Sequence, residues 1–551
     1  CLPPSMLRRA WKPALAATVP ALGGAYWYYS REPKEETFDL SVPVKRNGRR
    51  ERTTMTFPLL SQDATDARIR GNATAHTITR PGIVWHHTTA SVASNDPIED
   101  ATAHQVVRRD EGDGDLLFFA VMDGHGGFWT SQLLSRVLID AIALELSSLG
   151  KTVSDTWFGG VKSLWRRPQN KQDEDINLDA SSRGLPPPAT PMSSPLLVAR
   201  ALQKSFLSLD AELLAAPVRV LAAALAEDPD AKKGNASLKI PDLSKHPLAL
   251  PAMLPSLSGS CALLTMIDTA HNNMYVASAG DCRAVAGVWE PEQGKWRVEV
   301  LTEDQTGRNP SEAERMRREH PADEAGDVIR NGRVLGGLEP TRAFGDARYK
   351  WSRTLQATLY RAFLEGGDQQ ARGPPTLLKT PPYVTARPVV THRVLNLPKS
   401  DGAVTNAPAL RFIVLATDGL WDELSSEDVV RLVGGHIGGL RGNVPKDSLS
   451  NLVPTVAGSG TVQGKDADHR RARTSEAWTF VDDNASAHLI RNAFGGADAR
   501  SVREVLSIPS GLARSFRDDV SVTVVWWEQE NESKYQVATL TVPPPDVKAK
   551  L

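Results

Sequence analysis

Four apolar, strand-like runs in this chain each have an aspartate at one end, beside a glycine or a tight turn. These aspartates are Asp123, Asp281, Asp418 and Asp518. A buried strand fixes the position of its end residues, so we expect the four carboxylates to form one rim. Carboxylates that gather in one place repel one another and are stable only with cations between them. The pattern predicts a carboxylate-lined cation site at the ends of these strands.

The first of these runs, residues 116–121, leads into Asp123-Gly124-His125-Gly126-Gly127. The glycines leave the backbone free to turn sharply and allow a ligand to approach closely. His125 adds a group that titrates near neutral pH. Taken alone, the segment fits a simple turn capped by His125 equally well.

The acidic pair Glu99 and Asp100 lies in a Pro-containing turn, which by itself is typical of a solvated loop. Oxygen ligands without cysteine and with few histidines favour Mg²⁺ or Mn²⁺ over Zn²⁺. Two such ions lower the pKa of a bridging water and neutralise a phosphoryl group under in-line attack. The predicted chemistry is phosphate-ester hydrolysis without a covalent intermediate, with His125 placed to protonate the leaving oxygen.

The composition is that of a soluble globular enzyme, with 41% hydrophobic and 23% charged residues. The formal net charge of −1 gives no argument for a nucleic-acid partner. The three cysteines are too few and too scattered for a disulfide framework or a thiolate metal site. Cys261 and Cys282 are expected to be small buried hydrophobic residues.

The two ends of the chain carry targeting features. Residues 1–31 are basic, and their charge-free part, residues 13–30, is either a membrane anchor behind a transit signal or part of a disordered leader. Ala549-Lys550-Leu551 is a variant of the tripeptide that directs import into peroxisomes. Mitochondrial and peroxisomal locations are therefore both open.

Between the ends, changes in composition predict a linker, a large catalytic domain and a tail. The expected ranges are 32–82 for the linker, 83–530 for the domain and 531–551 for the tail, with irregular insertions near 151–195, 228–256 and 441–475. The expected helices cover residues 133–146, 196–227, 310–320 and the segment after the capping box of Ser425 and Asp428. His86 and His87 are interpreted as a strand-end pair, because no spaced partner accompanies them.

Six segments, in this order, resemble motifs of the metal-dependent Ser/Thr protein phosphatases of the 2C (PPM) class. They are Pro97-Ile98-Glu99-Asp100, Val121 to Gly127, Ala279-Gly280-Asp281-Cys282-Arg283-Ala284-Val285, Thr341 to Asp346, Ala416 to Asp422, and Arg517 to Val522. The resemblance implies an α+β fold, in which a β-sandwich of two antiparallel sheets is flanked by α-helices. It also implies a binuclear Mg²⁺ or Mn²⁺ centre at one end of the sandwich.

The same resemblance implies a role for each site residue. Asp123 would bridge both ions, Gly124 would offer its carbonyl oxygen, and Glu99 would bind the second ion. Asp418 and Asp518 would hold the first ion, and Asp100 would act through water. Asp281 and Asp422 would form a weaker third site, and His125 would be the general acid.

A finer resemblance is to the mitochondrial pyruvate dehydrogenase phosphatases of fungal type. It rests on Ser94-Asn95, the Glu- and Arg-rich segment 309–321, Arg342 to Asp346, and Ala485 to Arg491. It implies a phosphoprotein substrate, the pyruvate dehydrogenase E1 subunit. Asn95 occupies the position at which many members of the family have a phosphate-binding Arg. Arg342 and Arg348 are the candidates for the phosphate-binding cation in its place.

Two alternatives to an active protein phosphatase remain open at this stage. One is an inactive, phosphatase-shaped scaffold, which usually lacks one or more of the metal-binding carboxylates. The other is a metal-dependent hydrolase of small phosphoesters. The physiological substrate is not identified by the sequence.

Overall fold

The computed structural model describes residues 36–46, 49–108, 114–149, 175–182, 191–227, 240–365, 372–397, 407–458 and 475–529. The leader 1–31, the tail 531–551 and the three-residue C-terminal signal lie outside these residues. The chain forms two compact units, Cys1–Thr65 with Arg503–Ile508, and Asp66–Val502 with Pro509–Leu551. Among the helices of the described part, none has the length and apolar character that a membrane crossing requires.

The smaller unit contains one antiparallel hairpin, formed by β1 (Thr37–Arg46) and β2 (Arg49–Pro58). Phe38 pairs with Phe57 across the hairpin, and their ring centroids lie 6.0 Å apart. Arg503 secures the segment after β2, because its Nε donates to the Leu60 carbonyl at 2.7 Å. Both aromatic rings are buried, which gives the unit a small core of its own.

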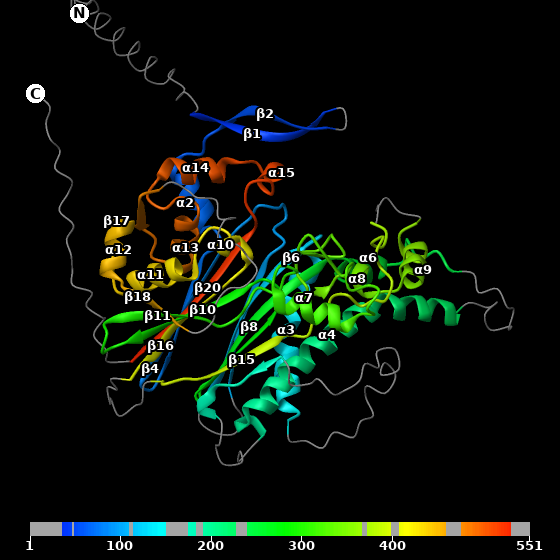
Figure 1. Cartoon of the computed structure of the whole chain (residues 1–551), viewed down its shortest axis with the longest axis horizontal. Coiled ribbons are helices and arrows are strands. Elements are labelled where there is room, and N and C mark those ends of the chain that lie inside the picture. The colour runs from blue at the N-terminus through cyan, green and yellow to red at the C-terminus, as the bar shows by residue number, and fades with distance from the viewer. Residues whose placement is uncertain are drawn as a thin grey trace, which may run out of the picture. The chain divides into compact units, whose positions relative to one another are not determined.

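The larger unit contains two seven-stranded sheets (Figure 1). The first has the order β18-β11-β10-β16-β20-β4-β3. Its strands are β3 (Thr74–Arg80), β4 (Ile83–Val92), β10 (Arg283–Glu290), β11 (Lys295–Val300), β16 (Ala409–Ala416), β18 (Thr455–Ala457) and β20 (Val520–Gln529). All pairs are antiparallel except β11 with β18 at one edge.

The second sheet has the order β5-β6-β8-β9-β15-β7, with β14 pairing on β8. Its strands are β5 (Ala101–Arg108), β6 (Asp115–His125), β7 (Ile176–Asn177), β8 (Gly259–Asp268), β9 (Asn273–Ala279), β14 (Phe344–Gly345) and β15 (Val389–Val394). Only the short edge pair of β15 with β7 is parallel. Two-stranded ladders are formed by β12 (Ile329–Arg330) with β13 (Arg333–Val334) and by β17 (Gly442–Pro445) with β19 (Ala477–Phe480).

One hydrophobic core lies between the two sheets. It joins Val121 and Leu263 of the second sheet to Ile413 and Val525 of the first, all of them fully buried. The central strands of both sheets are buried on both faces, so they appear in the sequence as continuous apolar runs rather than alternating ones.

Helices cover the outer faces of both sheets (Figure 1). On the second sheet lie α3 (Trp129–Ser147) and the long α4 (Pro195–Glu227), while α11 (Ser426–Ile437) and α13 (Ala485–Ala493) lie on the first. The remaining helices are α2 (Gln62–Arg70), α6 (Ala249–Leu257), α7 (Pro310–Glu319), α8 (Ala347–Lys350), α9 (Arg353–Phe363), α10 (Asp418–Trp421), α12 (Lys446–Leu452), α14 (Ala499–Ser507) and α15 (Ser510–Ala513). Short 3₁₀ turns occur at Ala180–Ser182 and Pro191–Ser193. Together the layers confirm the predicted sandwich flanked by helices.

Local sequence signals correctly predicted the starts of two of these helices. Asn309 caps α7 by accepting from the Ser311 backbone, with Pro310 at the first helical position. Ser425 and Asp428 form the predicted capping box of α11. Cys261 and Cys282 are buried, as expected.

Regular structure occurs in three of the segments predicted to be irregular. The expected linker 32–82 contains β1, β2, α2 and β3, and β3 extends the first sheet by pairing with β4. Most side chains of β3 are exposed, so the strand carries no apolar signal in the sequence. The expected insertions also contain structure, because all but the last residue of α6 lies in 228–256, and β17, α12 and β18 lie in 441–475. Residues 151–174 of the first insertion lie outside the described residues.

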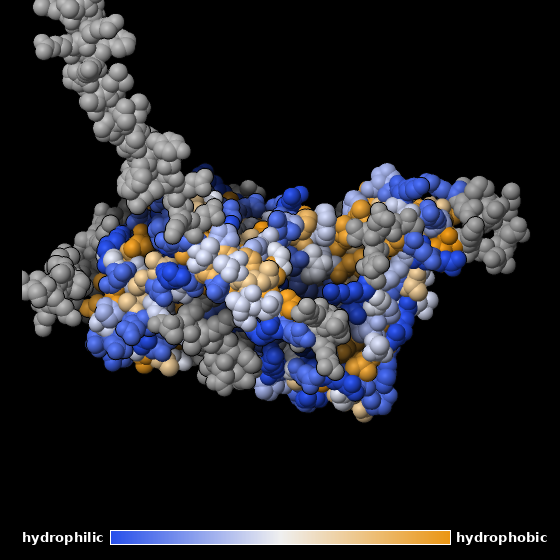
Figure 2. Space-filling model, turned by 90° about the horizontal axis from the view of Figure 1, so that it is seen from above, coloured by the Kyte–Doolittle hydropathy of each residue, from blue (hydrophilic) through white to orange (hydrophobic). Residues whose placement is uncertain are grey.

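On the face shown in Figure 2, hydrophobic residues are interspersed with hydrophilic ones. The large hydrophobic side chains that are exposed include Leu144, Leu248 and Val481, which come from separate parts of the chain. Scattered exposed hydrophobic residues are normal for a folded protein and do not mark a site.

Candidate active site

Three aspartates from the ends of strands come together at one edge of the sandwich. Asp123 lies near the end of β6, Asp281 follows β9, and Asp418 follows β16 as the first residue of α10. One carboxylate oxygen from each lies within 4.8 Å of the others. Because β16 belongs to the first sheet and β6 and β9 to the second, both sheets contribute to the cluster.

The protein environment disfavours the charged form of these carboxylates. Burial raises the pKa of Asp123 well above its ordinary value, and the charges of Asp418, Asp100 and Asp281 raise it further. The pKa of Asp100 is also raised well above normal, by burial first and then by Asp519 and Asp418. Carboxylates of this kind are stabilised by cations, and an all-oxygen donor set fits Mg²⁺ or Mn²⁺.

The loop that carries Glu99 and Asp100 is held by Asp519. The Asp519 carboxylate accepts from the backbone N–H groups of Ser94 at 2.5 Å, Asn95 at 2.9 Å and Glu99 at 2.9 Å. It also accepts from the Asn95 side chain at 2.9 Å. The Asn95 side chain therefore helps to hold the acidic loop on Asp519. The sequence interpretation gave no role to Asp519.

Glu99 and Asp100 are each tied to a neighbouring part of the site. The Thr417 hydroxyl donates to Asp100 Oδ2 at 2.9 Å, and the Gly127 N–H donates to Glu99 Oε1 at 2.8 Å. Gly124 lies directly under this loop, because a Cβ at Gly124 would lie 2.1 Å from the Glu99 carbonyl oxygen. Only glycine leaves room for the loop at that position.

Asp518 and Asp422 are not among the three carboxylates that the structure brings together, but each is next to a site residue in the chain, Asp518 directly before Asp519 and Asp422 at the end of the helix that Asp418 begins. Asp518 forms an ion pair with Arg514 and accepts from the Asp519 N–H at 2.7 Å. Asp422 caps α10, with its N–H donating to the Asp418 carbonyl at 2.8 Å. The side chain of Trp421 on the same helix is buried, and its Nε1 donates to the Ala416 carbonyl at 3.0 Å, which fixes the start of the Asp418 segment.

His125 is paired with Asp346, which the sequence placed within a motif but without a role. His125 Nε2 lies 2.7 Å from Asp346 Oδ2. Burial alone would lower the pKa of His125. The negative charge of Asp346, its hydrogen bond to His125 and the charges of Asp281 and Glu99 together outweigh burial, so the pKa is raised. A Cβ at Gly259 would lie 2.1 Å from His125 Nε2, so the pair depends on glycine at that position.

A buried ion pair supports the segment that carries Asp346. Lys350 Nζ contacts both carboxylate oxygens of Asp210 at 2.8 Å and the Ala343 carbonyl at 2.7 Å. Asp210 lies on α4 and also accepts from the Gly345 N–H at 2.9 Å. The long helix therefore holds Asp346 against β8 and beside His125.

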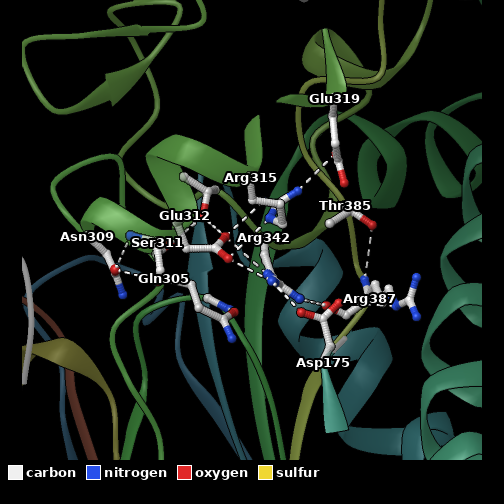
Figure 3. Close-up of polar contacts among 12 residues, drawn as sticks. Asp175, Gln305, Asn309, Ser311, Glu312, Arg315, Glu319, Arg342, Thr385 and Arg387 are labelled. Carbon is white, nitrogen blue, oxygen red and sulfur yellow. Dashed lines mark hydrogen bonds and ion pairs between the residues drawn. The ribbon is translucent and has the colours of Figure 1, made fainter. Parts of the chain in front are cut away.

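Arg342 is not available as a phosphate-binding cation, contrary to the guess from the sequence. Its side chain is 2% exposed and lies 2.6 Å from Glu312 and 2.9 Å from Asp175 (Figure 3). The Arg342 charge, with that of Arg315, overcomes the effect of burial and holds the pKa of Glu312 well below its usual range. Arg348 is half-buried and donates to the Gly373 carbonyl at 2.7 Å.

Arg514 is a cation near the acidic cluster that the sequence interpretation missed. Its side chain is half exposed and pairs with Asp518. Its positive charge opposes the pKa-raising effect of burial at both Glu99 and Asp123. Its position four residues before Asp518 was the only signal for it in the sequence.

Comparison with known proteins decides the family. A family model described as protein phosphatase 2C matches residues 197–441. A protein phosphatase 2C homolog from Schizosaccharomyces pombe is 32% identical over 86% of this chain and 87% of its own length. The chain belongs to the protein phosphatase 2C family. It is a protein serine/threonine phosphatase, and the predicted family is confirmed.

Two further relatives of this phosphatase are mitochondrial pyruvate dehydrogenase phosphatases. The mitochondrial pyruvate dehydrogenase (acetyl-transferring) phosphatase 1 of Saccharomyces cerevisiae is 30% identical over 85% of this chain and 73% of its own length. The human mitochondrial pyruvate dehydrogenase (acetyl-transferring) phosphatase 2 is 31% identical over 86% of this chain and 85% of its own length. A solved serine-threonine phosphatase 2C from Toxoplasma gondii covers 90% of this chain and 100% of its own, with 14% identity and a TM-score of 0.35.

Proposed function

We propose that this phosphatase hydrolyses phosphoserine and phosphothreonine in proteins with two Mg²⁺ or Mn²⁺ ions. Asp123, the Gly124 carbonyl, Glu99, Asp418 and Asp518 would hold the two ions. Asp100 would contribute to ion binding through a water molecule, and Asp281 and Asp422 would hold a third, more weakly bound ion. Bound ions of this kind activate a water molecule and neutralise phosphoryl oxygens during in-line attack.

The chain's own residues supply the proton for the leaving group. As water oxygen bonds to phosphorus, the bond between phosphorus and the serine or threonine oxygen breaks. His125 donates a proton from Nδ1, the ring nitrogen that is not paired with Asp346, to that oxygen. The attacking water keeps one proton on the inorganic phosphate that is released and loses the other to solvent, from which His125 is protonated again. Asp346 orients the imidazole ring of His125 for this transfer through the 2.7 Å contact between Asp346 Oδ2 and His125 Nε2.

Arg514 is the residue that receives the substrate phosphate in this proposal. It lies beside the acidic cluster, it reaches solvent, and Asn95 is occupied with Asp519. Arginine binds phosphate through its fork of N–H donors, and rotation away from Asp518 would direct this fork toward the substrate.

The three carboxylates within 4.8 Å of one another are the observation that carries the proposal. Its test is dephosphorylation of a phosphopeptide by the full chain with Mn²⁺. Wild type should turn over, and Asp123→Ala should not. An inactive wild type would support the scaffold alternative instead. A clear preference for a small phosphoester over the phosphopeptide would count against a protein substrate.

The proposed target is the phosphorylated E1 subunit of pyruvate dehydrogenase, in mitochondria. The names of the yeast and human relatives support this choice. The test compares phosphorylated E1 with an unrelated mitochondrial phosphoprotein, and equal rates would contradict the target. Localisation of full-length protein against versions lacking residues 1–31 or the last three residues separates the mitochondrial location from peroxisomal import through Ala549-Lys550-Leu551.

A further inference from the structure

Three histidines that are far apart in the sequence meet at one side of the sandwich, away from the strand ends described above. His76 lies on β3, His87 on β4 and His104 on β5. His76 and His87 are direct partners across the antiparallel ladder. β3 is the edge strand of the first sheet and β5 the edge strand of the second, so the histidines join the two sheets at their edges.

The three imidazole rings are close enough to share one ligand. One ring nitrogen from each lies within 4.8 Å of the others. The ring centroids are 4.7 Å apart for His76 and His87, 4.5 Å for His87 and His104, and 4.9 Å for His76 and His104. His76 and His104 are exposed, so both rings have room to rotate.

His87 provides an independent indication that the cluster takes a ligand. The residue is 3% exposed, and its Nε2 is buried without a hydrogen-bond partner. A buried polar nitrogen without a partner costs free energy that a bound ion would recover. The neighbouring His86 points the other way and is fully engaged, with Nδ1 3.2 Å from the Thr77 hydroxyl and Nε2 3.1 Å from Glu528.

We propose that His76, His87 and His104 form a site for one divalent transition-metal ion of the zinc class. Three imidazole nitrogens with one water molecule complete a tetrahedral shell, which requires nitrogen atoms roughly 3.3 Å apart for Zn–N distances of about 2.0–2.1 Å. Rotation of the exposed rings of His76 and His104 is sufficient to reach this spacing. Nitrogen donors select zinc-class ions, whereas the carboxylate cluster selects Mg²⁺ or Mn²⁺.

The charge state of the rings suits this role. Burial, followed by the charges of His104 and His76, lowers the pKa of His87 to about 3. Burial and then His76 also lower the pKa of His104. Both shifts favour the neutral ring, which is the form of imidazole that binds metals.

The consequence of binding is a cross-link between the two sheets. β3 and β4 belong to the first sheet and β5 to the second, so one ion would fasten both edges. A ligand that binds only the folded chain stabilises it. The competing interpretation is a stack of neutral rings that packs without a ligand, and binding measurements separate the two.

The test is a count of Zn²⁺ ions bound by the full chain in saturating Mg²⁺, by elemental analysis after gel filtration. The variants are His76→Asn and His104→Asn, which change exposed side chains and leave the buried His87 in place. His86→Asn is the matched control, because it changes the adjacent histidine on the opposite face. Repeating the count in the Asp123→Asn background separates this site from the carboxylate cluster.

The expected result is one more Zn²⁺ per chain in wild type and His86→Asn than in either of the other variants, in both backgrounds. Removal of one histidine should weaken Zn²⁺ binding at least about 100-fold. Loss of a residue that only hydrogen-bonds to a metal ligand weakens binding about 10–100-fold, and loss of the ligand itself should cost more. Co²⁺ bound at this site should give the intense visible absorption of a tetrahedral nitrogen-ligated ion. Equal Zn²⁺ counts and equal Co²⁺ spectra in wild type and His76→Asn would overturn the proposal.

Discussion

His125 Nε2 lies 2.7 Å from Asp346 Oδ2, although the two residues come from β6 and from the segment before α8. The pair gives the proposed general acid a fixed orientation. It depends on Gly259, which leaves room for both side chains, and on Lys350 and Asp210, which hold the Asp346 segment. Asp346 is therefore a positioning residue for His125.

The first prediction concerns the leaving group. His125→Ala should slow hydrolysis of a phosphoserine peptide by about 10²–10⁴-fold, the usual contribution of general acid catalysis. It should affect an activated aryl phosphate far less, because that leaving group departs without a proton. Asp346→Asn should show the same selectivity with a smaller loss. Steady-state kinetics with both substrates measure this, and equal losses on the two would remove His125 from its role.

The second prediction concerns Asp519, which anchors the Glu99 loop through hydrogen bonds to Ser94, Asn95 and Glu99. Asp519→Ala should raise the Mn²⁺ concentration for half-maximal activity by about 10–100-fold, because residues that orient metal ligands affect affinity to that extent. Asn95→Ala removes only the side-chain contact and should cause a smaller rise. An unchanged Mn²⁺ requirement in Asp519→Ala would show that the loop is held by other contacts.

The third prediction concerns Arg514. Arg514→Gln should lower kcat/KM for a phosphopeptide by about 10–100-fold, since a hydrogen bond to a charged group is worth about 1.5–3 kcal/mol. Product inhibition by inorganic phosphate should weaken in parallel. Arg361→Gln, on the exposed face of α9, is the control for loss of a surface charge. If phosphate inhibits Arg514→Gln as strongly as wild type, the phosphate-binding cation is another residue.

The fourth prediction concerns the stability of the Arg342 ion pair. Arg342→Met should lower the free energy of unfolding by about 3–5 kcal/mol at neutral pH, because it leaves Glu312 buried without its main partner. In wild type the pKa of Glu312 is lowered on folding, so its contribution is present above about pH 4.5 and is lost as the pH falls below that value. The difference between variant and wild type should therefore shrink in acid.

Urea unfolding at neutral pH and near pH 4 measures this difference. Arg348→Met is the matched control, because Arg348 is only half-buried and its described contacts are with the Gly373 carbonyl and the ring of Tyr349 rather than with a buried carboxylate. A loss for Arg342→Met that is no larger than for Arg348→Met, or that grows in acid, would contradict the assignment.

The sequence predicted those features that leave a local pattern. The strands that end at Asp123 and Asp418 are buried on both faces and appear as apolar runs, and the caps of α7 and α11 are set by short-range contacts. β3 escaped prediction because its side chains are mostly exposed. The pairing of Asp346 with His125 and of Arg342 with Glu312 and Asp175 depends on the tertiary fold, which sequence spacing does not encode.

The same limit explains the histidines and Asp519. His87 lacked a nearby partner in the sequence, and its neighbours His76 and His104 are brought to it by ladder register and by the packing of the two sheets. Asp519 directly follows Asp518, and only the fold shows that it faces the Glu99 loop.

The central claim is that the carboxylate cluster binds the ions on which phosphatase activity depends. The most direct test measures Mn²⁺ binding by equilibrium dialysis and phosphopeptide turnover on the same metal-stripped samples of wild type and Asp123→Asn. We predict that wild type binds at least two ions as turnover appears, and that Asp123→Asn loses both the ions and the turnover. Turnover by wild type that persists after complete metal removal, or full activity in Asp123→Asn, would contradict the account.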